Sequence, residues 1–134
     1  MRAFFDSNIF VYAFTSDQRS IIAYDLLQSG GVISTQSLNE LASVLRRKQK
    51  WDWSKTRLAL ETVIDRCPTY VVLDLNVHRR GLRIAERHRL SVYDGMIVAA
   101  ALIAECDTLY SEDMHDGLVV DGRLRIVNPF APAT

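Results

Sequence analysis

The sequence lacks any apolar run that approaches the roughly 20 residues of a membrane-spanning helix, so no transmembrane segment is expected. It has only two cysteines, Cys67 and Cys106, which are far apart and outside any C-x-x-C motif. This excludes a disulfide scaffold and favours a reducing cytoplasm. Asp6 interrupts the apolar stretch at the start of the chain, so no signal peptide is expected. The net charge is zero, because 16 basic residues balance 16 acidic ones.

The composition is otherwise that of an ordinary globular domain. Hydrophobic residues make up 49% and charged residues 24% of the 134 residues, which is far from the composition of disordered chains. There is no repeat, low-complexity run or linker, and a chain of this length buries roughly 68% of its unfolded surface on folding. We therefore expect a single domain over residues 1–134, with a core that needs no disulfide or metal.

Short apolar segments alternate with helical patterns along the chain. Strands are expected at residues 2–5, 32–33, 70–73 and 108–110, with one or two more within 118–127. Helices are expected at residues 17–27, 37–48, 54–66, 76–88 and 93–104. This order predicts an α/β fold with a mostly parallel sheet of 4–5 strands and helices on both faces. Residues 128–134 are expected to form an extended C-terminal tail.

The helix expected at residues 54–66 has a specific start signal. Ser54 is a suitable N-cap, and Trp53 before it is placed to pack on Leu58 as a hydrophobic staple. This interpretation gives Trp53 a structural role. The role of Trp51 stays open between packing in the protein and stacking on unpaired bases.

Four acidic residues fall at the ends of expected elements. Asp6 and Asp113 follow strands, where ligands bind in parallel sheets, Asp94 opens a helix, and Glu40 borders the apolar stripe of another helix. Each has a structural explanation as a turn, a cap or a surface residue. Gathered together, however, like charges raise one another's pKa, and such a cluster is costly without a cation such as Mg²⁺.

The segments around these acids resemble the motifs of PIN-domain ribonucleases, in the same order and over almost the whole chain. They read DSNIFVYA at 6–13, SLNEL at 37–41, LSVYDGMIVAAA at 90–101 and LYSEDM at 109–114. The compact size is similar to that of VapC-type toxins. The resemblance implies a single PIN-like domain that cleaves RNA with Mg²⁺ or Mn²⁺ and acts in the cytoplasm.

The resemblance also implies which residues form the site. Asp6, Glu40, Asp94 and Asp113 carry over as the catalytic acids. From the chemistry of RNA hydrolysis, we expect Asp6, Asp94 and Asp113 to hold metal and Glu40 to orient or deprotonate the attacking water. The supporting polar residues at matching positions are Asn8 and Ser111, and Asp116 is a further candidate that is equally suited to a turn with Gly117.

Basic residues form two clusters despite the zero net charge. One comprises Arg46, Arg47, Lys48 and Lys50, which are candidates for binding RNA, and the other comprises Arg79, Arg80, Arg83, Arg87 and Arg89. Both clusters could contact phosphates, and both are also explained as solvated ends and faces of helices, the second cluster more readily than the first. His78, His88 and His115 share no ligand spacing and are not expected to bind metal.

The family resemblance implies partners and leaves alternatives open. It implies a homodimer and a cognate antitoxin bound in a groove, with DNA reached only through the antitoxin and no membrane involved. Phe10, Tyr12 and Phe14 are candidates for that groove, or else core residues. A phosphatase on a doubly wound sheet is disfavoured because position 8 is Asn where a second acid is wanted. A catalytically silent PIN-fold binding or regulatory module stays open, as do the RNA substrate and the number of metal ions.

Overall fold

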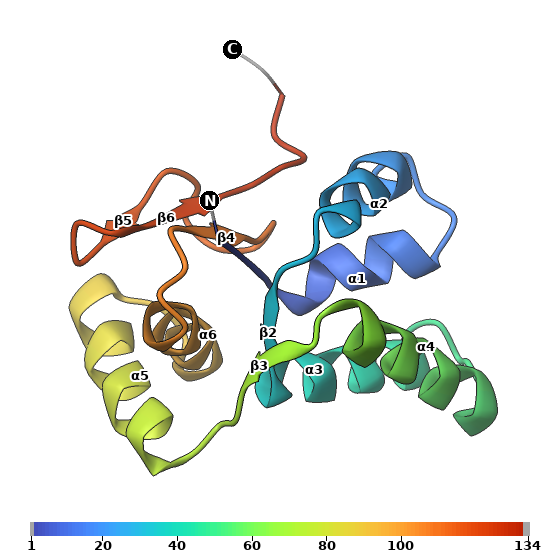
Figure 1. Cartoon of the computed structure of the whole chain (residues 1–134), viewed down its shortest axis with the longest axis horizontal. Coiled ribbons are helices and arrows are strands. Elements are labelled where there is room, and N and C mark those ends of the chain that lie inside the picture. The colour runs from blue at the N-terminus through green and yellow to red at the C-terminus, as the bar shows by residue number, and fades with distance from the viewer. Residues whose placement is uncertain (1, 133–134) are drawn as a thin grey trace.

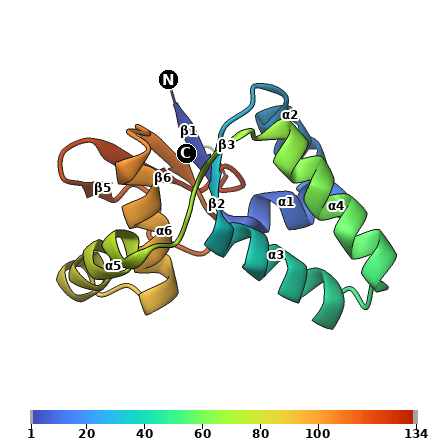
Figure 2. The same cartoon turned by 60° about the horizontal axis from the view of Figure 1, so that its bottom comes forward.

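A six-stranded sheet forms the centre of the fold in the computed structural model, which describes residues 2–132 (Figures 1 and 2). The strand order is β3-β2-β1-β4-β6-β5, and the strands span Ala3–Phe5 (β1), Val32–Ser34 (β2), Thr69–Val71 (β3), Thr108–Tyr110 (β4), Val119–Val120 (β5) and Leu124–Val127 (β6). All neighbouring pairs are parallel except β5 with β6. The α/β class is confirmed. The sheet has six strands where a count of 4–5 was expected, because residues 118–127 form both of the two strands allowed for them, with Asp121 and Gly122 at positive φ in the turn between β5 and β6.

Six helices connect the strands within residues 2–132. They span Ser7–Phe14 (α1), Ser20–Gln28 (α2), Thr35–Arg47 (α3), Trp53–Arg66 (α4), Leu75–His88 (α5) and Val92–Ile103 (α6). Five lie within three residues of the expected bounds. Sequence reasoning missed α1, whose aromatic and β-branched residues are types enriched in strands. It forms because Asp6 caps its first turn and its Ile9 and Phe10 side chains are buried.

Side-chain caps set where several helices begin. Ser34, Asp52, Asp74 and Ser91 each accept a hydrogen bond from the backbone N–H three residues later. The expectation that Ser54 caps α4 is wrong, because Asp52 does so, with its Oδ1 2.8 Å from the Lys55 N. Trp53 is therefore the first residue of α4 and not the residue before its cap. No staple covers Leu58, which is 70% exposed.

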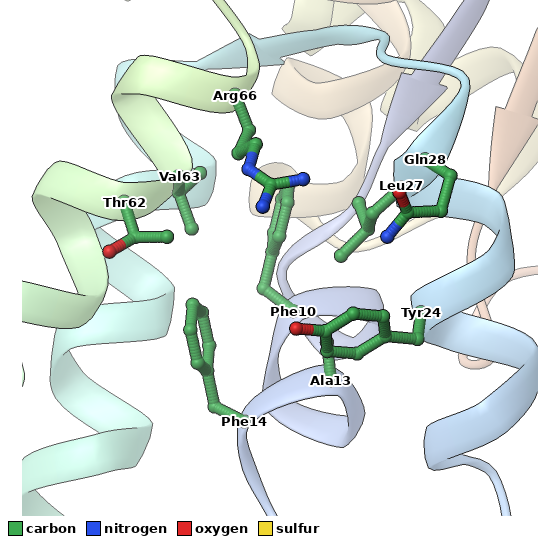
Figure 3. Close-up of a pocket in the computed structure, with 9 residues that line it drawn as sticks. All are labelled: Phe10, Ala13, Phe14, Tyr24, Leu27, Gln28, Thr62, Val63 and Arg66. Atoms are coloured by element: carbon green, nitrogen blue, oxygen red, sulfur yellow. The ribbon is translucent and has the colours of Figure 1, made fainter.

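Four helices, α1 to α4, pack around one hydrophobic core. Ala3 and Phe5 of β1 point to this side, where they join Ile33, Leu41 and Leu45. Figure 3 shows an open apolar groove at the edge of this core, with Phe10 and Phe14 from α1, Tyr24 and Leu27 from α2 and Val63 from α4 around it. The alternation of side chains along β1 thus divides the helices between the two faces of the sheet.

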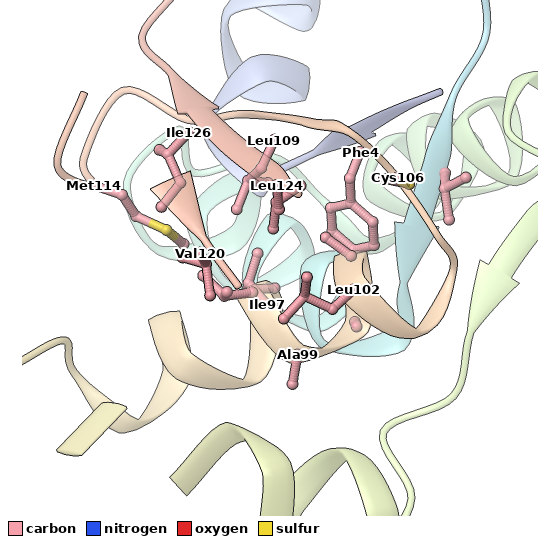
Figure 4. Close-up of a cluster of buried hydrophobic side chains, with 14 of the residues drawn as sticks. Phe4, Ile97, Ala99, Leu102, Cys106, Leu109, Met114, Val120, Leu124 and Ile126 are labelled. Atoms are coloured by element: carbon pink, nitrogen blue, oxygen red, sulfur yellow. The ribbon is translucent and has the colours of Figure 1, made fainter. Parts of the chain in front are cut away.

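The other core lies between the sheet and α6, with α5 outside it. Phe4, Leu109 and Ile126 point from the strands toward Ile97 and Leu102 of α6 (Figure 4). Residues 96–102 of α6 are all buried, which explains the almost continuous apolar sequence there. Both cysteines are free and buried, one in each core.

Residues 128–132 follow β6 and contain a turn. The Asn128 N–H donates to Asp116, and Phe130 packs edge-on against Tyr12 with ring centroids 5.1 Å apart. Residues 133–134, which belong to the expected tail, lie outside the described residues. No helix within residues 2–132 has both the length and the apolar character to cross a membrane.

Candidate active site

Asp6 occupies the centre of the site, directly after β1 and at the start of α1. Its Oδ1 accepts a hydrogen bond from the Ser7 backbone N–H (2.8 Å), and its Oδ2 accepts one from the Ser111 hydroxyl (2.7 Å). Only 4% of the residue is exposed. Burial outweighs these hydrogen bonds and raises the pKa of Asp6 from 3.8 to about 7, and the charges of Glu40 and Asp94 act in the same direction.

Glu40 reaches the same place from α3. Its Oε2 accepts a hydrogen bond from the Ser7 hydroxyl (3.2 Å), and its Oε1 accepts one from Gln36 Nε2 (2.9 Å) one turn earlier on the helix. Ser7 therefore joins Glu40 to Asp6, since its N–H and its hydroxyl bind the two carboxylates. Glu40 is half-buried at the edge of the apolar stripe, as the sequence predicts.

Asp94 lies in the first turn of α6, where the Ser91 cap accepts a hydrogen bond from its N–H (3.1 Å). Partial burial raises the pKa of Asp94, and the charges of Glu40 and Asp113 raise it further. The next residue, Gly95, allows α6 to lie close against α5. A Cβ at Gly95 would come 2.4 Å from the Gly81 carbonyl oxygen. The position of Asp94 thus depends on a helix contact that only glycine permits.

Asp113 lies in the loop after β4 and is exposed. Its Oδ2 accepts a hydrogen bond from Asn8 Nδ2 (3.3 Å), while Asn8 Oδ1 accepts one from the Glu112 N–H (3.3 Å). Asn8 therefore binds the loop through both ends of its amide. The buried Ser111 donates to Asp6, so the two predicted supporting residues, Asn8 and Ser111, each bind one of the four acids.

A second hydrogen-bonded network supports the loop after β4 through Glu112. The sequence did not predict this network. Arg19 Nη1 donates to Glu112 Oε2 (2.9 Å) and to the Tyr12 hydroxyl (2.7 Å), and Tyr12 in turn donates to Glu112. Asp17 binds the same guanidinium at 2.8 Å. Burial and the bond to Glu112 raise the pKa of Tyr12 to about 12. The partners are about 90 to 100 positions apart, so no local pattern reveals them.

Other sequence candidates lie outside this cluster. Asp116 Oδ1 accepts a hydrogen bond from the Asn128 N–H (2.8 Å), which gives it a structural role beside the turn at Gly117. The basic candidates Arg46, Arg47, Lys48 and Lys50 are at the far end of α3 from its capping Ser34 and in the loop after it. Tyr12 belongs to the network described above, whereas Phe10 and Phe14 line the groove of Figure 3.

The acidic cluster suits a hard divalent cation but does not form a closed cage. Within residues 2–132, no three His, Cys, Asp or Glu side chains are close enough together to enclose a metal ion. Mg²⁺ usually binds one or two carboxylates and keeps several waters, so it needs no such cage. Asp6 and Asp94 both have raised pKa values for which a nearby cation would compensate. The donor chemistry therefore fits Mg²⁺ or Mn²⁺.

Comparisons with known proteins agree with this fold. The model of the PIN domain family matches residues 3–115. A chain of a toxin–antitoxin complex from Klebsiella pneumoniae is 21% identical, with 96% of this chain and 98% of that chain covered and a TM-score of 0.71. VapC20, a sarcin–ricin loop cleaving toxin of Mycobacterium tuberculosis, is 16% identical over 80% of this chain and 86% of its own (TM-score 0.67). DNA-bound VapBC from Salmonella typhimurium is 18% identical over 94% and 96% (TM-score 0.66). No curated protein sequence matches.

Proposed function

The chain belongs to the PIN domain family, and from this premise we propose that it is a metal-dependent endoribonuclease, the toxin of a type II toxin–antitoxin pair acting in the cytoplasm. The observation that supports this best is the meeting of Asp6, Glu40, Asp94 and Asp113 at one end of the sheet, where burial and, to a smaller extent, the neighbouring carboxylates raise the pKa values of Asp6 and Asp94. An isolated structural role for each acid would not require them to interact.

Asp6, Asp94 and Asp113 are the proposed ligands of Mg²⁺ or Mn²⁺. These carboxylates would hold an ion whose chemistry, when bound, would be to offset negative charge on the scissile phosphate and to lower the pKa of a water molecule. Ser111 and the Ser7 N–H stabilise the ionised form of Asp6 through their hydrogen bonds. Asn8 holds Asp113 in the loop after β4, where Asp113 is exposed.

Glu40 is the proposed group that orients the attacking water and accepts its proton. Ser7 and Gln36 each donate to a different oxygen of its carboxylate, which fixes the side chain beside Asp6. Each oxygen keeps a further lone pair with which to accept a hydrogen bond from water. Position and free acceptor capacity are what a general base requires.

The groove of Figure 3 is the proposed docking surface for the antitoxin. It is lined mainly by apolar side chains of α1, α2 and α4, with Arg66 reaching across it. An apolar segment with an acidic residue opposite Arg66 would match that chemistry. The structural neighbours described as a toxin–antitoxin complex and as VapBC support such a partner, and DNA would be reached through it. We also propose a homodimer, which light scattering of the purified protein tests directly.

Cleavage of labelled total RNA by the purified, antitoxin-free chain tests the proposal. We expect bands in Mn²⁺ or Mg²⁺ that disappear with chelator and with Asp94→Asn. Asp116→Asn is the matched control, because it removes an acid outside the cluster while its amide oxygen still accepts from the Asn128 N–H. A folded wild-type chain that cleaves no RNA pool would instead indicate a PIN-fold binding module without catalytic activity.

A further inference from the structure

The junction between α3 and α4 carries the strongest local charge imbalance near an exposed aromatic ring. Residues 46–57 contain six basic residues and one acid, Asp52, so this segment has a net charge of +5 and the rest of the chain −5. Asp52 is used as the cap of α4. The ion pairs found within residues 2–132 both involve Arg19, so no carboxylate pairs with these six cations.

Two cation–aromatic stacks organise this surface. The Arg46 guanidinium lies over the Trp53 ring, 4.3 Å from its centroid, and Arg46 Nη1 also donates to the Trp51 carbonyl oxygen (2.7 Å). The Lys55 ammonium lies 4.0 Å from the centroid of Trp51. Arg46 is thus fixed in direction before any ligand binds, which lowers the entropy cost of binding.

Apart from its stack with Arg46, Trp53 does not make the hydrophobic contact that the sequence predicts for it. Its expected partner Leu58 is 70% exposed, and Trp53 itself is 55% exposed in the first turn of α4. Trp51, in contrast, is partly buried and packs edge-on against Phe14 with centroids 6.4 Å apart. One tryptophan therefore anchors the junction in the core, and the other presents its ring to solvent.

The junction is connected to the acidic cluster by a single rigid element. Arg46 and Arg47 follow Glu40 by six and seven residues on α3, which is about 10 Å along a helix. Figure 2 shows α3 running outward from the end of β2 to its turn into α4. A strand of nucleic acid lying along α3 would reach both places.

We propose that this junction is a platform for single-stranded RNA, with Trp53 stacked on a base and Arg47, Lys48 and Lys50 bound to phosphates. Stacking on an exposed ring accepts any unpaired base, and neighbouring cations follow the backbone, which is the pattern of single-strand binding surfaces. Arg46 backs the ring with a positive charge that favours this stacking. The inference rests on the proposed nuclease function for its substrate class, since the platform would position the strand that the acids cleave.

The test is binding of a fluorescein-labelled oligouridine, measured by anisotropy in chelator with Asp94→Asn as the background, so that binding is separated from cleavage. We expect Trp53→Ala to weaken binding about 10-fold and Trp53→Phe to keep most of the affinity. Tyr70→Ala is the matched control, because it removes another exposed aromatic ring, on β3, and should have no effect. Circular dichroism checks that each variant is folded.

Salt dependence separates this platform from general attraction to positive charge. Lys50→Gln should reduce the slope of log affinity against log salt by about 0.7, the value for one phosphate contact of a single strand. Arg83→Gln removes an exposed arginine of α5 and should leave the slope unchanged. Equal effects of the two changes, or an unaltered affinity of Trp53→Ala, would overturn the proposal. If Trp53→Ala weakens binding while the wild-type chain cleaves no RNA, the platform stands and the nuclease proposal fails.

Discussion

Replacing Asp6 with Asn should make the metal-free protein more stable while removing its activity. The Asp6 carboxyl is buried, and its pKa is raised to about 7. Asn is as good an N-cap as Asp, so the bond to the Ser7 N–H is retained. Its amide N–H₂ can donate to the Ser111 hydroxyl, which now donates to Asp6 Oδ2. The substitution therefore removes only the buried charge.

The size of the effect follows from the pKa difference. A carboxyl whose pKa is higher in the folded protein binds more protons there, so stability is lost as the pH rises from 3.8 toward 7. The shift of about three units corresponds to at most about 4 kcal/mol above pH 7, since each unit is worth about 1.4 kcal/mol. For 134 residues, 1 kcal/mol changes the melting temperature by about 3.5 °C. The upper limit for Asp6→Asn is thus about 14 °C.

Thermal melts in chelator at pH 5 and pH 8 measure the difference in stability between Asp6→Asn and the wild type. The advantage of Asp6→Asn over the wild type should grow by about 2.5 kcal/mol between the two pH values, whereas Asp116→Asn should show no such trend. Added Mn²⁺ should raise the melting temperature of the wild type and leave that of Asp6→Asn nearly unchanged. A variant less stable than the wild type at pH 8, or an advantage that does not grow with pH, would refute the reasoning.

Further predictions concern the residues that support the acids. Gly95→Ala should lower the melting temperature by several degrees and reduce cleavage, which thermal melts and a cleavage assay would measure. Overpacking against the Gly81 carbonyl oxygen costs about 1–3 kcal/mol, which exceeds the gain in helix propensity of about 1 kcal/mol from replacing Gly with Ala. Ser111→Ala should move the lower limb of the pH–rate profile to higher pH, because the lost hydrogen bond raises the pKa of Asp6 further. Glu112→Gln should cost less than about 1 kcal/mol of stability, since the ion pair between Glu112 and Arg19 is partly exposed. The same change should reduce the single-turnover cleavage rate several-fold, because it loosens the loop that carries Asp113. Removing metal with chelator should abolish cleavage reversibly, with activity restored by Mn²⁺ but not by Ca²⁺.

The closeness of the four acids was predictable from the place of each one in its strand, loop or helix. Asp6 follows an apolar strand, Asp94 opens an apolar helix, and parallel strands place their carboxyl ends on the same edge of the sheet. Glu40 was predictable from its place beside the apolar stripe of α3. Such positions can be predicted because the pattern of apolar residues in the sequence indicates which side of each strand or helix is buried.

The features that the sequence did not predict depend on a choice between two similarly favourable local structures or on contacts between distant residues. The segment of α1 has the composition of a strand, and only the Asp6 cap and its burial against Phe5 make it helical. Asp52 and Ser54 are both good N-caps, and the sequence contains nothing that decides between them. Arg19 meets Glu112 only because the fold brings their two loops together. Such pairs become visible only in three dimensions.

The most direct test of the account compares five variants in one RNA cleavage assay at saturating Mn²⁺. Asp6→Asn, Glu40→Gln, Asp94→Asn and Asp113→Asn each remove one charge of the cluster with little change of shape, and Asp116→Asn removes one outside it. We predict that each of the first four loses at least about 100-fold in single-turnover rate while remaining folded, and that Asp116→Asn stays within about twofold of the wild type. Wild-type rates in folded Asp6→Asn or Asp94→Asn would contradict the proposal that these four carboxylates form the catalytic centre.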